Sequence, residues 1–235
     1  MSPISSTGPK ILSDFSKFSE FVLNNQKQMT PKIFSQQLGY IQRNFIAAKQ
    51  RELFCEEADK LATKLVAAEN GDFAGIIYSA LTKLTEYFPR ELELYAKKGL
   101  AVAEQNGDYV HVMARLNNLR KVYIDKPDRL YDYINTLYAQ EKCLKKLSKS
   151  YESVTENYKT VTRKAAKKED YEKMLAYVQT EIGKLTWKKH PNDAMKKLLN
   201  ARNIFIARGD SSQSVEYINF LISKIEKLST FDKSV

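Results

Sequence analysis

Cysteine, glycine and proline are all scarce in this sequence, and each shortage excludes a class of protein. The 235 residues include two Cys, eight Gly and six Pro. All-β and Rossmann-like folds need more Gly and Pro than this in their turns. The cysteines, Cys55 and Cys143, stand alone rather than in a CxxC motif. We therefore expect two buried thiols in a reducing compartment.

Long apolar runs are missing as well. No window approaches the roughly 18 apolar residues of a membrane span. The first residues, MSPISSTGPK, lack the basic start and unbroken apolar stretch of a secretory signal. We therefore expect a cytoplasmic protein.

The usual signatures of enzymes and cofactor sites are also absent. The glycines are isolated, and no GK[ST] phosphate-binding motif occurs. Neither His111 nor His190 has a Cys, Asp or Glu at a usual ligand spacing on the same helix face, so we expect no metal site. Lysines beside Cys143 could make its thiol reactive by lowering its pKa, but no histidine lies near it in sequence to act as a base. We expect a non-enzymatic protein with no cofactor.

Helical periodicity is what the sequence does contain. Apolar residues make up 43% of the chain and include 14 Tyr and 11 Phe, enough for a real core. They recur at spacings of three and four, as in Val112, Leu116 and Leu119. This spacing predicts amphipathic helices and almost no strand. Because proline is tolerated in the first turn of a helix, four prolines mark helix starts: Pro31, Pro89, Pro127 and Pro191.

One phrase occurs twice: VAAENGDF at 66–73 and VAEQNGDY at 102–109. Gly71, Gly107 and Gly209 are each followed by Asp. We expect each Gly to end a helix in the left-handed conformation and each Asp to cap the next helix. Weaker echoes stand at Glu169-Asp170-Tyr171 and at Gly209-Asp210. Recurrence at about 34–40 residues predicts stacked helical hairpins.

These corners resemble those of the tetratricopeptide repeat (TPR). Ala67 and Ala103 match its small position, GDF, GDY and EDY match its corner, and Phe88-Pro89 lies near its closing proline. The sequence departs from the family in lacking a Trp in the first helix and an early Ala in the second, and in inverting the Leu-Gly pair at Gly99-Leu100. The resemblance covers residues 51–126 and, more loosely, 150–230. It implies a TPR-like α-solenoid that presents a curved surface to a protein partner.

The segment 128–168 fits the hairpin pattern less well. Apolar residues alternate at three and four from Leu130 to Ala165 without a Gly or Pro. This heptad pattern predicts one long helix with a coiled-coil-like seam. The alternative, which we favour, is a break at Ser148-Lys149-Ser150 that restores a hairpin of ordinary length.

Positive charge is concentrated near the C-terminus. Residues 141–235 hold 20 Lys+Arg against 12 Asp+Glu, a net of +8 out of +10 for the chain. Such a surface is either an ordinary solvated face or a contact for nucleic acid, acidic lipid or an acidic protein. Lysine dominates over arginine, which argues against specific phosphate recognition. The candidate basic surface comprises Lys142, Lys145, Lys146 and Lys149, which share one helix face, and Arg163, Lys164, Lys167 and Lys168.

The sequence therefore predicts an all-α protein of stacked antiparallel helical hairpins, either a TPR-like solenoid or an irregular bundle. We expect a helical-repeat domain at 30–229, an N-terminal segment at 1–29 with a short helix over Ile11–Asn24, and a tail at 230–235. The expected function is a non-enzymatic scaffold for a protein partner of unknown identity. The alternatives are nucleic-acid association through the basic helices and, less favoured, peripheral binding to acidic membranes.

Overall fold

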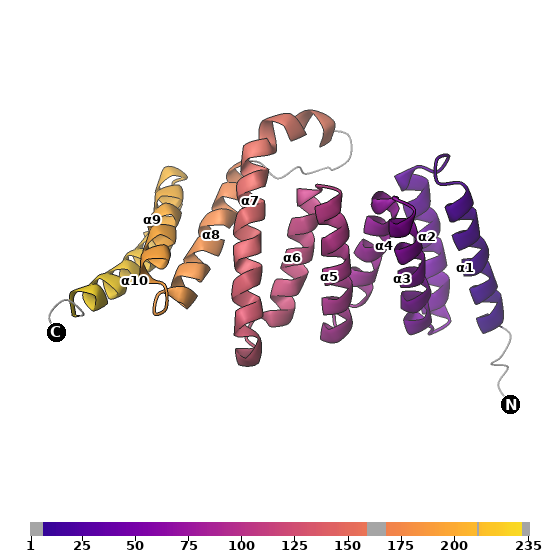
Figure 1. Cartoon of the computed structure of the whole chain (residues 1–235), viewed down its shortest axis with the longest axis horizontal. Coiled ribbons are helices and arrows are strands. Elements are labelled where there is room, and N and C mark those ends of the chain that lie inside the picture. The colour runs from indigo at the N-terminus through magenta and orange to yellow at the C-terminus, as the bar shows by residue number, and fades with distance from the viewer. Residues whose placement is uncertain (1–6, 159–167, 211, 232–235) are drawn as a thin grey trace. The chain divides into compact units, whose positions relative to one another are not determined.

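A computed structural model of the chain describes residues 7–158, 168–210 and 212–231 (Figure 1). Within these ranges the chain forms α-helices, one 3-10 turn and short connections, with no strand. This confirms the predicted all-α class. None of the helices in these ranges is both long enough and apolar enough to cross a membrane.

The chain divides into two compact units, residues 1–122 and 123–235. In the first unit α1 packs on α2, α2 on α3, α3 on α4 and α4 on α5, and α2 also packs on α4. In the second unit α7 packs on α8, α8 on α9 and α9 on α10. The first unit contains α1 (Thr7–Asn24), α2 (Pro31–Ala47), α3 (Arg51–Ala67), α4 (Gly71–Leu84), α5 (Pro89–Gln105) and α6 (Tyr109–Tyr123, whose last residue opens the second unit). The second contains η1 (Pro127–Arg129), α7 (Leu130–Tyr158), α8 (Lys168–Thr186), α9 (Pro191–Ala207) and α10 (Ser212–Phe231).

An aromatic cluster forms the core of the first unit. Phe15 of α1 meets Phe45 and Phe54 edge-on, and Phe34 stacks on Phe73 with ring centroids 4.5 Å apart. All five rings are buried, and each contributes about 1.5–3 kcal/mol of hydrophobic stabilisation. The predicted N-terminal helix therefore exists, begins at Thr7 rather than Ile11, and belongs to this core.

Each of the four prolines stands at the start of a helical segment, as predicted. A backbone N–H in the first turn of a helix has no partner within the helix, so proline, which lacks this group, costs the helix no hydrogen bond there. At Pro31 the preceding Thr30 also accepts a hydrogen bond from the Ile33 N–H at 3.3 Å.

Four helix ends share one backbone corner, which closes α2, α3, α5 and α9. A residue with positive φ follows the helix: Lys49, Glu69, Gly107 or Gly209. The next N–H then donates to a carbonyl five residues back, as in Asp108 to Ala103 at 2.9 Å and Asp210 to Phe205 at 3.0 Å. The left-handed residue itself donates to a carbonyl three residues back, as in Gly107 to Glu104 at 3.1 Å. Together the two bonds satisfy carbonyls that the end of the helix would leave without a partner.

The expectation for Gly71 was wrong. Gly71 is the first residue of α4, while Glu69 takes the left-handed position and Asn70 caps α4 through the Phe73 N–H. In the corner after α3, Glu69 therefore occupies the position that Gly107 occupies in the corner after α5, and Gly71 does not. Gly107 itself has the expected positive φ of 66°, and Asp108 accepts from the His111 N–H at 3.1 Å.

The favoured break at Ser148-Lys149-Ser150 was also wrong, because α7 runs unbroken for 29 residues to Tyr158. Serine is tolerated there since the Ser148 hydroxyl donates to the Leu144 carbonyl one turn back, at 2.9 Å. The rest of the predicted seam, residues 159–167, lies outside the described residues.

The second unit repeats one hairpin of the first. Pro191 follows Pro89 by 102 residues, and Gly209 follows Gly107 by the same 102. The helices α5 and α9 each have 17 residues, begin at the proline and end in the same left-handed corner. The hairpins α5–α6 and α9–α10 therefore share one pattern of start and corner.

Candidate functional site

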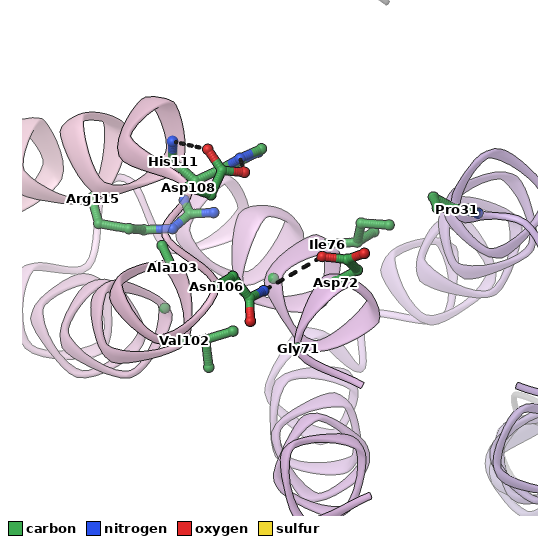
Figure 2. Close-up of a pocket in the computed structure, with 12 residues that line it drawn as sticks. Pro31, Gly71, Asp72, Ile76, Val102, Ala103, Asn106, Asp108, His111 and Arg115 are labelled. Atoms are coloured by element: carbon green, nitrogen blue, oxygen red, sulfur yellow. Dashed lines mark hydrogen bonds and ion pairs between the residues drawn. The ribbon is translucent and has the colours of Figure 1, made fainter. Parts of the chain in front are cut away.

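An open pocket of about 180 Å³ lies in the first unit. It is lined by the first turns of α4, the C-terminal half of α5 and the first turns of α6, with Pro31 of α2 at one edge (Figure 2). The hairpin corners bring these helix ends together, so residues distant in sequence share one cavity. Its lining on α4 and α5 is mainly small or apolar, apart from Asp72 and Asn106, whereas the start of α6 contributes only polar residues.

Glycines make room for this pocket. A Cβ atom added at Gly75 of α4 would meet nothing within 4 Å, so the cavity is open above this residue. At Gly99 of α5 a Cβ would lie 2.9 Å from both the Tyr78 Cβ and the Arg115 Nε. Gly99 is therefore needed for the close approach of α4 and for the path of the Arg115 side chain.

Arg115 of α6 is the unusual residue of the pocket. Only 4% of it is exposed, yet its partners are two neutral hydroxyls on α4: Thr82, at 2.8 Å, and Ser79. Its Nε has no hydrogen-bond partner, and no carboxylate of the described residues forms an ion pair with it. Burial lowers the pKa of Arg115 to about 10, an effect that the more distant Asp108 opposes. The guanidinium therefore remains charged at neutral pH.

Asp108 and His111 stand beside Arg115 at the start of α6 (Figure 2). The Asp108 carboxylate accepts from the His111 backbone N–H and lies 2.5 Å from the His111 ring Nδ1. Burial alone would raise the pKa of Asp108, but hydrogen bonds from the His111 ring and backbone outweigh it and lower the pKa. Asp108 thus binds its own helix start and histidine instead of neutralising Arg115.

The rim opposite is a link between α5 and α4. Asn106 donates to the Asp72 carboxylate at 3.5 Å, a long hydrogen bond that Figure 2 draws as a dashed line. Asn106 and Asp72 are both exposed. The lining includes no Ser, Thr, Cys, Lys or Tyr. The lining therefore offers hydrogen-bonding groups from Asp, Asn, His and Arg side chains and no hydroxyl or thiol group.

The predicted basic surface is partly described. Lys142, Lys145 and Lys146 are exposed on α7, and Lys145 forms an ion pair with Glu141 at 2.7 Å. Lys149 and Lys168 lie in α7 and α8, although their side chains are not described. Arg163, Lys164 and Lys167 lie outside the described residues.

Glu141 is the centre of a buried polar network in the second unit. Its carboxylate accepts from Lys145 and Lys197, each at 2.7 Å, and from Gln179 at 2.9 Å. Burial would raise the pKa of Glu141, but these hydrogen bonds outweigh it and lower the pKa. The network joins α7, α8 and α9. Asp193 lies 3.7 Å from Lys197 and completes a set of two carboxylates and two lysines, so we assign the network to stability rather than to ligand binding.

Cys55 and Cys143 are both buried thiols, as expected. Burial raises the pKa of Cys55 to about 11. His190 occupies the N-cap position of α9, and its side chain makes no capping hydrogen bond. No group of three metal-ligating side chains occurs among the described residues.

Sequence reasoning missed the pocket, although two signals were present. Asp108 is three residues before His111, so the expectation that neither histidine has a carboxylate on its own face was wrong. Arg115 falls between Val112 and Leu119 at spacings of three and four, which places a cation on the apolar stripe of α6. Buried arginine is rare unless it is paired, so this position was already informative.

Comparisons with known proteins give no family for this chain. No family model matches, and no curated protein matches. This chain is similar to a solved chain titled "DHF58 filament". The match covers 96% of this chain and 95% of that one, with 15% identity and a TM-score of 0.22.

Proposed function

We propose that this protein is a non-enzymatic helical-repeat protein that binds a protein partner. The observation that carries the proposal is the pocket between α4, α5 and α6, in which the buried Arg115 guanidinium forms no ion pair with any residue that the structure describes. Interior charges of folded proteins are normally paired, and unpaired ones concentrate at functional sites. A binding role also fits the lining, which has hydrogen-bonding groups but no hydroxyl or thiol nucleophile.

A peptide segment fits this lining better than a flat or highly charged ligand does. Ile76 and Val102 offer apolar contact, while Asn106 and Arg115 offer donors. Proteins present this mixture of apolar side chains and acceptors, and helical hairpins hold the complementary groups rigidly.

The test is capture of partners by crosslinking, with benzoyl-phenylalanine incorporated at Ile76 and, as a control, at the exposed Tyr40 of α2. The expected result is a protein crosslinked only from position 76, resistant to nuclease and to moderate salt. Crosslinks that disappear on nuclease treatment would reject the proposal in favour of nucleic acid.

The exposed lysines of α7 favour a second candidate, association with nucleic acid or acidic lipid. Changing Lys142, Lys145, Lys146 and Lys149 together to Gln removes four positive charges. If they contact a duplex, the slope of log affinity against log salt is expected to flatten by up to about 0.9 per lost phosphate contact. Titrations with RNA, a DNA duplex and acidic vesicles at low salt decide this, since absence of all binding leaves the protein-binding proposal alone.

A further inference from the structure

We propose that the Arg115 pocket binds a carboxylate of the protein partner, from an acidic side chain or from a chain terminus. The inference rests on the proposed protein-binding function and names the group that the partner supplies.

The Arg115 guanidinium has more hydrogen-bond donors than its neighbours use. It has five N–H donors in a planar fork, and among the described residues only Thr82 and Ser79 accept from it. Two neutral hydroxyls give hydrogen bonds but no countercharge. Asp108 lies nearby but is bound to His111, and no carboxylate of the described residues forms an ion pair with the guanidinium. A buried cation without an ion pair is costly, so a ligand that supplies a carboxylate in direct contact binds strongly. Carboxylate matches the fork because two oxygens can accept two parallel N–H bonds.

The charges around the pocket select the kind of anion. Asp72 and Asp108 line the same cavity as Arg115, and one of them is already bound to His111. Two carboxylates beside a single guanidinium repel a dianionic phosphate more than a monoanionic carboxylate. The remaining space suits a carboxylate on a short apolar stem, which would lie against Ile76 and Val102.

Gly75 allows the site to be blocked without touching its charge. A leucine at position 75 would project into open space, and it favours the helix over glycine. Gly39 of α2 is the matched control, because it is also inside a helix and a Cβ there meets only the Arg43 side chain, at 3.9 Å.

The experiment follows the Nε–Hε signal of Arg115 by NMR, assigned from its absence in Arg115→Gln. The full chain is titrated with N-acetyl-Ala-Glu-Ala-amide, N-acetyl-Ala-Ala-Ala with a free carboxylate, N-acetyl-Ala-Gln-Ala-amide and inorganic phosphate. We expect the two carboxylate peptides to shift the signal, and their relative affinities distinguish side chain from terminus. The Gln peptide and phosphate are expected to bind at least about tenfold more weakly, the loss typical of a hydrogen bond to a charged group.

The variants complete the test. Gly75→Leu should abolish the shift and Gly39→Leu should leave it unchanged, with circular dichroism confirming that both fold. Absence of a shift up to about 10 mM peptide, an equal response to phosphate, or binding that survives Gly75→Leu would each overturn the inference. A protein crosslinked from position 76 whose binding is unaffected by Gly75→Leu and Arg115→Gln would overturn the carboxylate site and leave the proposed function standing.

Discussion

Exchanging the residue at the left-handed position of two equivalent corners is expected to change stability in opposite directions. Glu69 and Gly107 occupy this position after α3 and α5, with φ of 58° and 66°. A Cβ at Gly107 would meet nothing within 4 Å, so Gly107→Ala adds no clash. Only the backbone preference remains as a cause.

The magnitude follows from two opposing terms. An L-residue in the left-handed region costs about 1–2 kcal/mol. Replacing Gly by Ala also restricts the unfolded chain, which offsets about 0.4–1 kcal/mol. Gly107→Ala is therefore expected to lower the free energy of unfolding by about 1 kcal/mol, and Glu69→Gly to raise it by about the same amount.

Urea unfolding measured by far-UV circular dichroism is the suitable assay, because the single Trp187 lies in the second unit and does not report on these corners. Changes in midpoint at constant slope give the differences in stability. Gly71→Ala is the control. Gly71 has no positive φ and an added Cβ would meet the movable end of Asn106, so a small effect is expected. Destabilisation of Gly71→Ala to the same extent as Gly107→Ala, or the same sign for Glu69→Gly and Gly107→Ala, would refute the reasoning.

Four further outcomes are expected. Gly99→Ala should destabilise by about 1–3 kcal/mol in urea unfolding because its Cβ overlaps packed neighbours, whereas Gly75→Ala should stabilise by roughly 0.5–1 kcal/mol. Glu141→Gln should lower the free energy of unfolding by about 3 kcal/mol, because it leaves buried partners of the carboxylate without their ion pair. Since the pKa of Glu141 is lowered in the folded state, this difference in stability between wild type and variant should be full above the ordinary pKa of 4.5 and should vanish as the pH falls through the folded pKa. In a Cys143→Ala background, Cys55 should resist a maleimide at pH 7.5 until urea unfolds the chain. Arg115→Met should leave unfolding free energy unchanged or raised, since it replaces an unpaired buried charge, and a large loss would show that the charge is structural.

The helices were predictable because their causes are local. Proline at a first turn and apolar residues at spacings of three and four act within one helix, so Pro31, Pro89 and Pro191 marked true starts. The Ser148 break failed for a reason that is also local: a serine hydroxyl can bond back to its own helix, and composition alone does not show whether it will.

The prediction for Gly71 failed because two residues that align in sequence need not occupy the same position in the backbone corner. The phrase containing Gly71 aligns without a gap with that containing Gly107, and both include Asn-Gly-Asp, yet the chain turns two residues earlier, at Glu69. Asn70 can cap α4 as well as Asp can, so the cap moved with the turn. The feature that repeats is the backbone hydrogen bond from the residue after the left-handed position to a carbonyl five residues back, and not the Gly-Asp phrase.

The pocket required knowledge of which helices meet. Arg115 reaches Thr82 and Ser79, 33 and 36 residues away, and no periodicity within α6 specifies those partners. Glu141 is similar, since its partner Lys197 lies 56 residues away on α9. Polar residues on an apolar stripe show that a partner is needed, and only the packing shows whether it is present.

Comparison of the hairpins α5–α6 and α9–α10 shows which residues the hairpin itself requires and which belong to the pocket alone. In α9–α10 the position matching Gly99 is Ala201, which is fully buried, and the position matching Arg115 is Tyr217, which is 43% exposed. A hairpin with the same proline start and the same left-handed corner therefore forms without the glycine and without the buried cation. Gly99 and Arg115 depend on each other, because the missing Cβ leaves the space that the Nε occupies. Neither residue is required by the hairpin, and an unpaired guanidinium costs stability, so the pair is what the proposed carboxylate-binding function would require of the first unit.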